Sequence, residues 1–319
     1  LAFGQLTDAT DTPCLVVAAK AADVGSLRRA GTVLGINARP ASATMTLEQR
    51  WIDVNKDKLA FKITGARGYG EAGEVIRAVS LDDDATIDSL IIGSSNVDPN
   101  LAATLSDHWG ATYILYTPIP AGAEFALNPL GAPSPVPTLG YKKFKGVGGY
   151  DVAVARVAVG AATETLYAIS NSVASSTPEN EQYAGRVYLF YGSSIAGVTD
   201  VDISKKQADV VISGAFKNDE MGRSILFGPV GVGGNLALIL GATFMDPKIP
   251  SETDPRYDAG QMYLFPAAMF SPIPGDSNAD QYLNFKDVFY QSLLWSGNMD
   301  WRILDNWQGR NAFPSPRAQ

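Results

Sequence analysis

The sequence predicts an all-β fold, a β-propeller built of about five four-stranded modules, of which the first and the last are incomplete. The first observation behind this prediction is a stretch that recurs four times. A glycine is followed by alternating strand-forming residues, with a large apolar residue three places after the glycine, at residues 30–34, 109–113, 184–188 and 259–263. Self-similarity at a period of several tens of residues indicates an array of supersecondary units.

A second stretch recurs upstream of each of these. Three apolar residues are followed by two small ones at residues 15–19, 90–94, 157–161 and 238–242, and a fifth copy lies at residues 293–297. Short apolar runs rich in Val, Ile, Tyr and Phe that end in Gly, Pro, Asn or Asp are typical of strands. The small residues suit places where neighbouring modules approach closely, because glycine permits close backbone contact.

Glycine spacing is the third observation. Gly65, Gly131 and Gly214 each precede an alanine, and each is followed eight or nine residues later by another glycine, at positions 73, 140 and 222. The next pair of a glycine and a small residue begins 19 or 20 residues further on, at positions 93, 160 and 241. Fixed spacing is typical of strands and tight turns that pack, whereas the variable spacing after these pairs is typical of exposed loops.

Each module is expected to carry about four strands. In the second module we expect one after Gly73, one at Leu90, one at Thr112 and one ending at Gly131. A four-stranded meander cannot bury both faces by itself, so the modules must stack radially in one domain. A side chain at Gly185, which opens a repeated strand, should clash with a neighbouring strand or require an unfavourable backbone angle. The modules are placed roughly at residues 1–66, 67–132, 133–215, 216–275 and 276–319.

The composition is globular and acidic. Of 319 residues, 46% are hydrophobic and 18% are charged, and the formal net charge is −8. This charge argues against nucleic acid and anionic lipid as main partners, since both are recognised by basic patches. No apolar run approaches the roughly 20 residues that a spanning helix needs, so we expect no membrane insertion. Cys14, the single cysteine, is expected to be a small core hydrophobe.

Several stretches together resemble the FG-GAP repeat family, the blade type of the integrin α-subunit propeller and of many bacterial surface proteins. The matching stretches are Ile63-Thr64-Gly65, Ile212-Ser213-Gly214 and residues 90–93, 184–188 and 238–242. The resemblance covers roughly residues 10 to 300, and it implies a propeller on a cell or virion surface. The chain departs from the family at the Phe-Gly pair: Ala72, Leu139 and Met221 stand before the glycine where the family has Phe. The family's propellers usually have seven blades.

In that family an acidic loop binds calcium, and the resemblance implies a candidate site in the second module alone. Alternating oxygen ligands wrap a hard cation in such loops. The candidate ligands are Ser80, Asp82, Asp84 and Asp88. Ala85 replaces the turn glycine and the register is shifted by one residue, so a solvated acidic turn is the alternative. The matching loops around residues 148–155 and 229–236 have almost no carboxylates.

Catalytic signals are sparse, and we expect no enzyme. His108 is the only histidine, and it stands beside Trp109 at the start of a predicted strand, where a structural role is favoured. The glycine runs at residues 146–149 and 231–234 lack the Lys-Ser/Thr pair and the helix of a phosphate loop. Carboxylates are abundant, so an acid pair of the glycosidase kind, which forms in space, stays open.

Two functions remain. The first is an extracellular binding or adhesion module for a protein or glycan ligand, presented by loops at residues 163–183 and 246–258. The second is a structural subunit of a fibre, virion or surface layer that contacts sister subunits. The Pro-rich residues 118–137 and the tail with Trp295, Trp301 and Trp307 fit the second function. The core of the closing blade is the alternative place for these Trp side chains, and it is favoured. The chain has no Asn-x-Ser/Thr sequon, which favours a prokaryotic or viral source over a eukaryotic glycoprotein.

Overall fold

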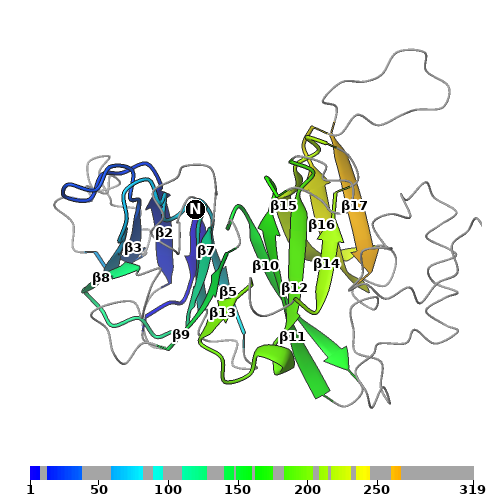
Figure 1. Ribbon diagram of the computed structural model, residues 1–319. Helices are drawn as coiled ribbons and strands as arrows, with labels where there is room; N and C mark the ends of the chain where they lie inside the picture. Colours follow the sequence, from blue (N-terminus) through cyan, green and yellow to red (C-terminus); the bar gives the residue numbers. More distant parts are fainter. Residues whose placement is uncertain are drawn as a thin grey trace, which may run out of the picture. The chain divides into compact units, whose positions relative to one another are not determined.

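Strands dominate the protein (Figure 1), which confirms the predicted all-β class. The helical element among the described residues is one short 3-10 turn, η2 at Ser193–Ile195. No helix in this part of the chain is long and apolar enough to cross a bilayer. The computed structural model describes residues 1–7, 13–37, 59–81, 89–95, 110–127, 140–146, 149–159, 162–174, 183–203, 208–214, 217–230, 235–244 and 260–266.

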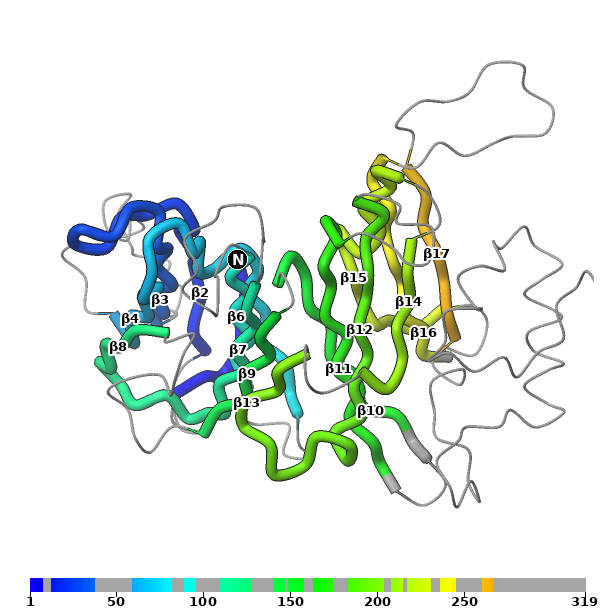
Figure 2. The backbone as a smooth tube through the Cα atoms, in the orientation of Figure 1, coloured from blue at the N-terminus to red at the C-terminus, as the bar shows by residue number. Residues whose placement is uncertain are grey.

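The chain divides into two compact units. Unit 1 comprises residues 1–152 and 197–206, and unit 2 comprises residues 153–196 and 207–319. Figure 2 follows the backbone through four sheets, two in each unit. The sheets are open among the described residues, and no closed propeller is detected.

The first sheet of unit 1 has the strand order β1-β2-β3-β4-β8. Neighbours among the first four strands pair antiparallel, in chain order. These four are β1 (Ala2–Gly4), β2 (Cys14–Ala19), β3 (Thr32–Asn37) and β4 (Phe61–Gly65). Burial alternates along β4, with Phe61 and Ile63 buried, because successive side chains of a strand point to opposite faces.

The second sheet of unit 1 has the order β5-β6-β7-β9-β13. It contains β5 (Ile76–Val79), β6 (Ser89–Ser94), β7 (Ala111–Leu115), β9 (Tyr141–Lys145) and β13 (Asp200–Asp202). Strands after Gly73, at Leu90 and at Thr112 were expected, and β5, β6 and β7 confirm them. Every residue of β6 and β7 is buried, so these strands are covered on both faces.

Unit 2 holds the third and fourth sheets. The third has the order β10-β11-β12-β14 and the fourth the order β15-β16-β17. The third sheet contains β10 (Val152–Val159), β11 (Ala162–Asn171), β12 (Arg186–Tyr191) and β14 (Val210–Ser213). The fourth contains β15 (Met221–Val230), β16 (Asn235–Ala242) and β17 (Gln261–Pro266).

Each unit has its own hydrophobic core between its two sheets. In unit 1, Val16 and Ile63 of the first sheet lie in one cluster with Leu90 and Tyr113 of the second. In unit 2, Val187 and Leu189 of the third sheet lie in one cluster with side chains of the fourth, such as Tyr263. Cys14 is fully buried in the core of unit 1, which confirms its predicted role as a small hydrophobe.

The fourth strand of the second module is not where the sequence placed it. The strand before Gly131 is β8 (Ala123–Leu127), and it pairs parallel with β4 of the first sheet. The second sheet takes its fourth strand from β9, which ends just before Gly146. Spacing along the chain cannot distinguish these arrangements, because β8 and β9 both read as short strands and only tertiary pairing assigns each to a sheet.

Two copies of the repeated stretches are also corrected. Residues 157–159 belong to β10, the first strand of the third sheet, whereas β11 takes the place that β2, β6 and β16 hold in their sheets. The residue equivalent to Gly65 in the second sheet is Gly146, and not Gly131 as the spacing predicted. The Gly146 N–H donates to the Gly110 carbonyl at 3.2 Å, and the Gly65 N–H donates to the Gly31 carbonyl at 2.9 Å. Gly140 directly precedes β9 and is not the counterpart of Gly73.

Candidate binding surface

The predicted calcium site lies mostly outside the described residues. Ser80 is described and exposed, directly after β5, whereas Asp82, Asp84 and Asp88 are not described. In the described part of the chain, no three His, Cys, Asp or Glu side chains are grouped to hold a metal ion. Calcium at this loop therefore stays a prediction.

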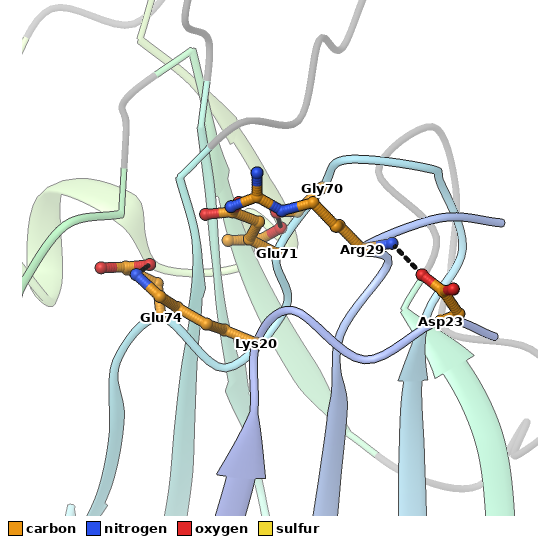
Figure 3. A network of polar contacts seen from close by, with 7 residues as sticks. Lys20, Asp23, Arg29, Gly70, Glu71 and Glu74 are labelled. Atoms are coloured by element: carbon orange, nitrogen blue, oxygen red, sulfur yellow. Dashed lines mark hydrogen bonds and ion pairs between the residues drawn. The ribbon is translucent and has the colours of Figure 1, made fainter.

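A polar network joins two connections at one end of the first sheet (Figure 3). These are the β2–β3 connection and the β4–β5 connection, which together we call the double turn of unit 1. Lys20 Nζ lies 2.6 Å from a Glu74 carboxylate oxygen, and Arg29 forms an ion pair with Glu71. The backbone N–H of Arg29 donates to Asp23 Oδ1 at 2.8 Å. Each ion pair links the two connections, so the network fixes one against the other.

Backbone hydrogen bonds join the same two connections. Glu71 N–H donates to the Arg29 carbonyl and Ala72 N–H to the Ala30 carbonyl, both at 3.0 Å. Three non-glycine residues adopt left-handed backbone here: Arg29 at φ 48°, Tyr69 at φ 60° and Glu71 at φ 53°. Such conformations cost roughly 1–3 kcal/mol each and persist only where the surroundings enforce them.

Unit 2 repeats this geometry in its own double turn, formed by the β11–β12 and β14–β15 connections. Glu220 N–H donates to the Tyr183 carbonyl and Met221 N–H to the Ala184 carbonyl, again at 3.0 Å. Tyr183, Asn218 and Glu220 have φ of 56°, 66° and 49°. The same backbone with different side chains shows that the turn is a property of the repeat, and that its exposed positions are free to vary between copies.

At each double turn, one glycine occupies a position that has no room for a side chain. Gly31 has φ 89° and Gly185 has φ 88°. A Cβ on Gly31 would overlap the Ala72 backbone, 2.9 Å from its carbonyl carbon, and one on Gly185 would overlap the Met221 backbone, 2.8 Å from its carbonyl carbon. Both the expected clash and the expected backbone angle at Gly185 are thus confirmed.

Exposed aromatic rings sit on these fixed turns. Tyr69 in unit 1 is 50% exposed and Tyr183 in unit 2 is 48% exposed. The Arg29 side chain is 52% exposed in spite of its ion pair. Tyrosine on a rigid backbone gives large contact area at little cost in conformational entropy, which is why such positions are typical of binding surfaces.

A small cavity lies beside the double turn of unit 1. It is lined by Gly65, Gly70, Ser94 and Tyr113, among others, and its volume is about 10 Å³. That is room for about one water molecule, far below the roughly 300 Å³ of a small-molecule site. The Tyr113 hydroxyl is buried with no hydrogen-bond partner among the described residues, and burial raises the pKa of Tyr113.

An ion pair with a buried lysine, which was not predicted from the sequence, holds β13 against β9. The Lys143 side chain is fully buried, and its Nζ lies 3.1 Å from Asp200 Oδ2. Burial lowers the pKa of Lys143, while the Asp200 carboxylate opposes that shift. The Tyr141-Lys142-Lys143-Phe144-Lys145 run was the available signal in the sequence. Its acidic partner is more than fifty residues away, so spacing could not reveal the pair.

The predicted loops fare differently. Residues 163–183 are not one long loop, because β11 extends to Asn171. Tyr183 nevertheless belongs to the double turn. In the Pro-rich region, β8 pairs within the first sheet. Some residues that the sequence singled out lie outside the described part, namely 246–258, His108, Trp109, Trp295, Trp301 and Trp307.

Comparison with known proteins leaves the family open. No protein-family model matches the chain, and no curated protein gives a significant match to it.

Proposed function

We propose that this protein is a non-catalytic binding module of the FG-GAP type, exposed on a cell or virion surface, with a protein or glycan ligand. The observation that carries the proposal is the repeated double turn. The same backbone hydrogen bonds recur in both units, while the outward side chains change from Arg29 and Tyr69 to Tyr183 and Asn218. A fixed scaffold with variable exposed positions is the usual design of recognition surfaces.

A propeller is the closed arrangement we propose for the modules. The first and second sheets each contain four strands that follow one another in chain order, and the third sheet has the same strand order. Within each unit, one sheet packs on the next through apolar faces. Radial stacking of further modules buries the remaining faces in the same way.

A structural subunit is the second candidate, favoured by one feature of the fourth sheet. Leu226 and Met262 are 50% and 66% exposed. Leu226, Ile239 and Leu264 are directly cross-strand neighbours on three successive strands. Ile239 and Leu264 are half-buried, and a partly exposed apolar face of this kind fits contact with a sister subunit. A monomer by size-exclusion chromatography with light scattering, at micromolar concentration, would argue against that candidate.

The binding proposal is tested on glycan and protein arrays with the intact chain. We expect Tyr69→Ala combined with Tyr183→Ala to remove binding that the wild type shows. Pro229→Ala, an exposed position near the end of β15 that is opposite the double turn of unit 2, is the control and should bind like the wild type. Binding that survives the double substitution at full strength would refute the role of the double turns. Turnover of an arrayed glycan would contradict the non-catalytic assignment.

A further inference from the structure

Two sheets carry a fifth strand that is supplied by the next module. β4 is the fourth strand of the first sheet, and β8 pairs with it in parallel. β9 is the fourth strand of the second sheet, and β13 pairs with it in parallel. β8 lies in the chain between β7 and β9, and β13 lies between β12 and β14. In both cases the donor is the connection between the third and fourth strands of the following sheet.

The two fifth strands share their side-chain chemistry. Lys62 lies opposite Glu124 with Nζ 3.6 Å from the carboxylate, and Lys143 lies opposite Asp200 with the corresponding distance at 3.1 Å. Cross-strand pairs of opposite charge stabilise such a register. The two lysines are equivalent, because each lies three residues before the glycine whose N–H donates to the repeat glycine, Gly65 or Gly146.

The segments that lead into these strands are also alike. A fully buried isoleucine, Ile119 or Ile195, stands five residues before the acidic residue. A glycine with left-handed backbone follows it, Gly122 three residues later at φ 75° or Gly197 two residues later at φ 72°. Both connections thus place a buried isoleucine and then a left-handed glycine before the fifth strand, with the glycine shifted by one residue.

The third sheet has an equivalent fourth strand, β14, but no fifth strand pairs with it among the described residues. One edge of β14 pairs with β12, and no strand in the described part of the chain pairs with its other edge. Unpaired edges are usually covered or blocked in native proteins. The donor expected from the pattern is the connection that follows β17, the third strand of the fourth sheet.

The sequence after β17 carries a third copy of the lead-in segment. The copies read Thr-Pro-Ile-Pro-Ala-Gly at residues 117–122, Ser-Ser-Ile-Ala-Gly at residues 193–197 and Ser-Pro-Ile-Pro-Gly at residues 271–275. The third copy places Ile273 in the position of Ile119 and Ile195. Five residues further stands Asn278, in the position of Glu124 and Asp200.

We propose that residues 276–280 bind the outer edge of β14 as a parallel fifth strand, with Asn278 opposite Val211. Ser213 pairs with Arg186, the residue after the repeat glycine, so Val211 takes the position of Lys62 and Lys143. Val211 stands at the position of the lysine, and Asn278 stands at the position of the acidic residue. Both charges of the ion pair are therefore absent here, and neither strand would carry an unpaired charge at this position. Residues 276–280 lie outside the described part of the chain, and the proposal does not depend on the binding function.

Engineered disulfides test this register. Val211→Cys with Asn278→Cys places two cysteines opposite each other, and Lys62→Cys with Glu124→Cys does the same at the described β4–β8 pair, as the positive control. Val211→Cys with Tyr282→Cys is the register control. After mild oxidation of the folded protein, peptide mass spectrometry should find the intramolecular 211–278 disulfide at a yield similar to that of the positive control. The register control should form far less.

The proposal is overturned if the positive control closes but the 211–278 pair does not. A 211–278 disulfide found only between two chains also overturns it, because the segment would then belong to a second copy. A substitution without cysteine gives an independent measurement. Ile273→Ala should lower the denaturant midpoint as Ile119→Ala does, and a wild-type midpoint for Ile273→Ala beside a lowered one for Ile119→Ala would also refute the proposal.

Discussion

Substitution of the repeat glycines separates two physical effects that the structure combines at one site. Gly31 has a left-handed backbone, and a Cβ there would also overlap the Ala72 backbone. Gly122, in the same unit, has a left-handed backbone at φ 75° but open space around its Cβ position. Gly31→Ala therefore tests backbone angle plus overlap, and Gly122→Ala tests the angle alone.

The magnitudes follow from these two terms. A left-handed backbone costs an L side chain roughly 1–2 kcal/mol, and loss of freedom in the unfolded chain returns about 0.4–1 kcal/mol. Gly122→Ala should therefore destabilise by about 1 kcal/mol or less. Overlap adds typically 1–3 kcal/mol, and the obstacle at Gly31 is backbone that cannot rotate away, so Gly31→Ala should destabilise by about 3 kcal/mol.

Equilibrium unfolding in urea, followed by tryptophan fluorescence and circular dichroism, measures both variants. Gly185→Ala repeats the test in unit 2, where the overlap is with the Met221 backbone, and should match Gly31→Ala within about 1 kcal/mol. If the midpoints of Gly31→Ala and Gly122→Ala coincide, close backbone contact at the repeat glycine contributes nothing to stability. If Gly185→Ala and Gly31→Ala differ by more than about 1 kcal/mol, the assigned equivalence of the double turns is wrong.

Three further predictions concern charge and metal. Burial raises the pKa of Tyr113 above its unfolded value of 10.0, so the folded state keeps a proton that the unfolded state loses. Stability should fall above about pH 10, by up to about 1.4 kcal/mol per pH unit, and Tyr113→Phe should remove that part of the slope in pH-dependent urea titrations. Asp200→Ala should lower the free energy of unfolding by about 2 kcal/mol, because it leaves Lys143 buried without its carboxylate. Glu124→Ala, at the exposed counterpart, should lower it by under about 0.5 kcal/mol. Equal effects in urea unfolding would contradict this. If the second-module loop binds calcium, millimolar calcium should raise the melting temperature and Asp84→Ala should abolish the rise, whereas no difference between calcium and chelator would show an acidic turn.

The sequence by itself determined the class of the fold and most of its strands. Alternating apolar residues and punctuating glycines predicted the strands at Leu90 and Thr112, because side-chain alternation and turn chemistry are local properties. The special role of Gly185 was also predicted, since the recurrence of one glycine at one place in each repeat indicates a shared backbone constraint.

Only the tertiary structure decided which strands pair. The segment before Gly131 reads as a strand, yet it joins the first sheet, and residues 200–202 join the second sheet from far along the chain. The double turns were hidden for the same reason, because Arg29 and Glu71 meet through backbone hydrogen bonds between two separate connections. Local sequence fixes the conformation that a segment prefers, whereas its partner is chosen by burial and hydrogen bonding with residues distant in the chain.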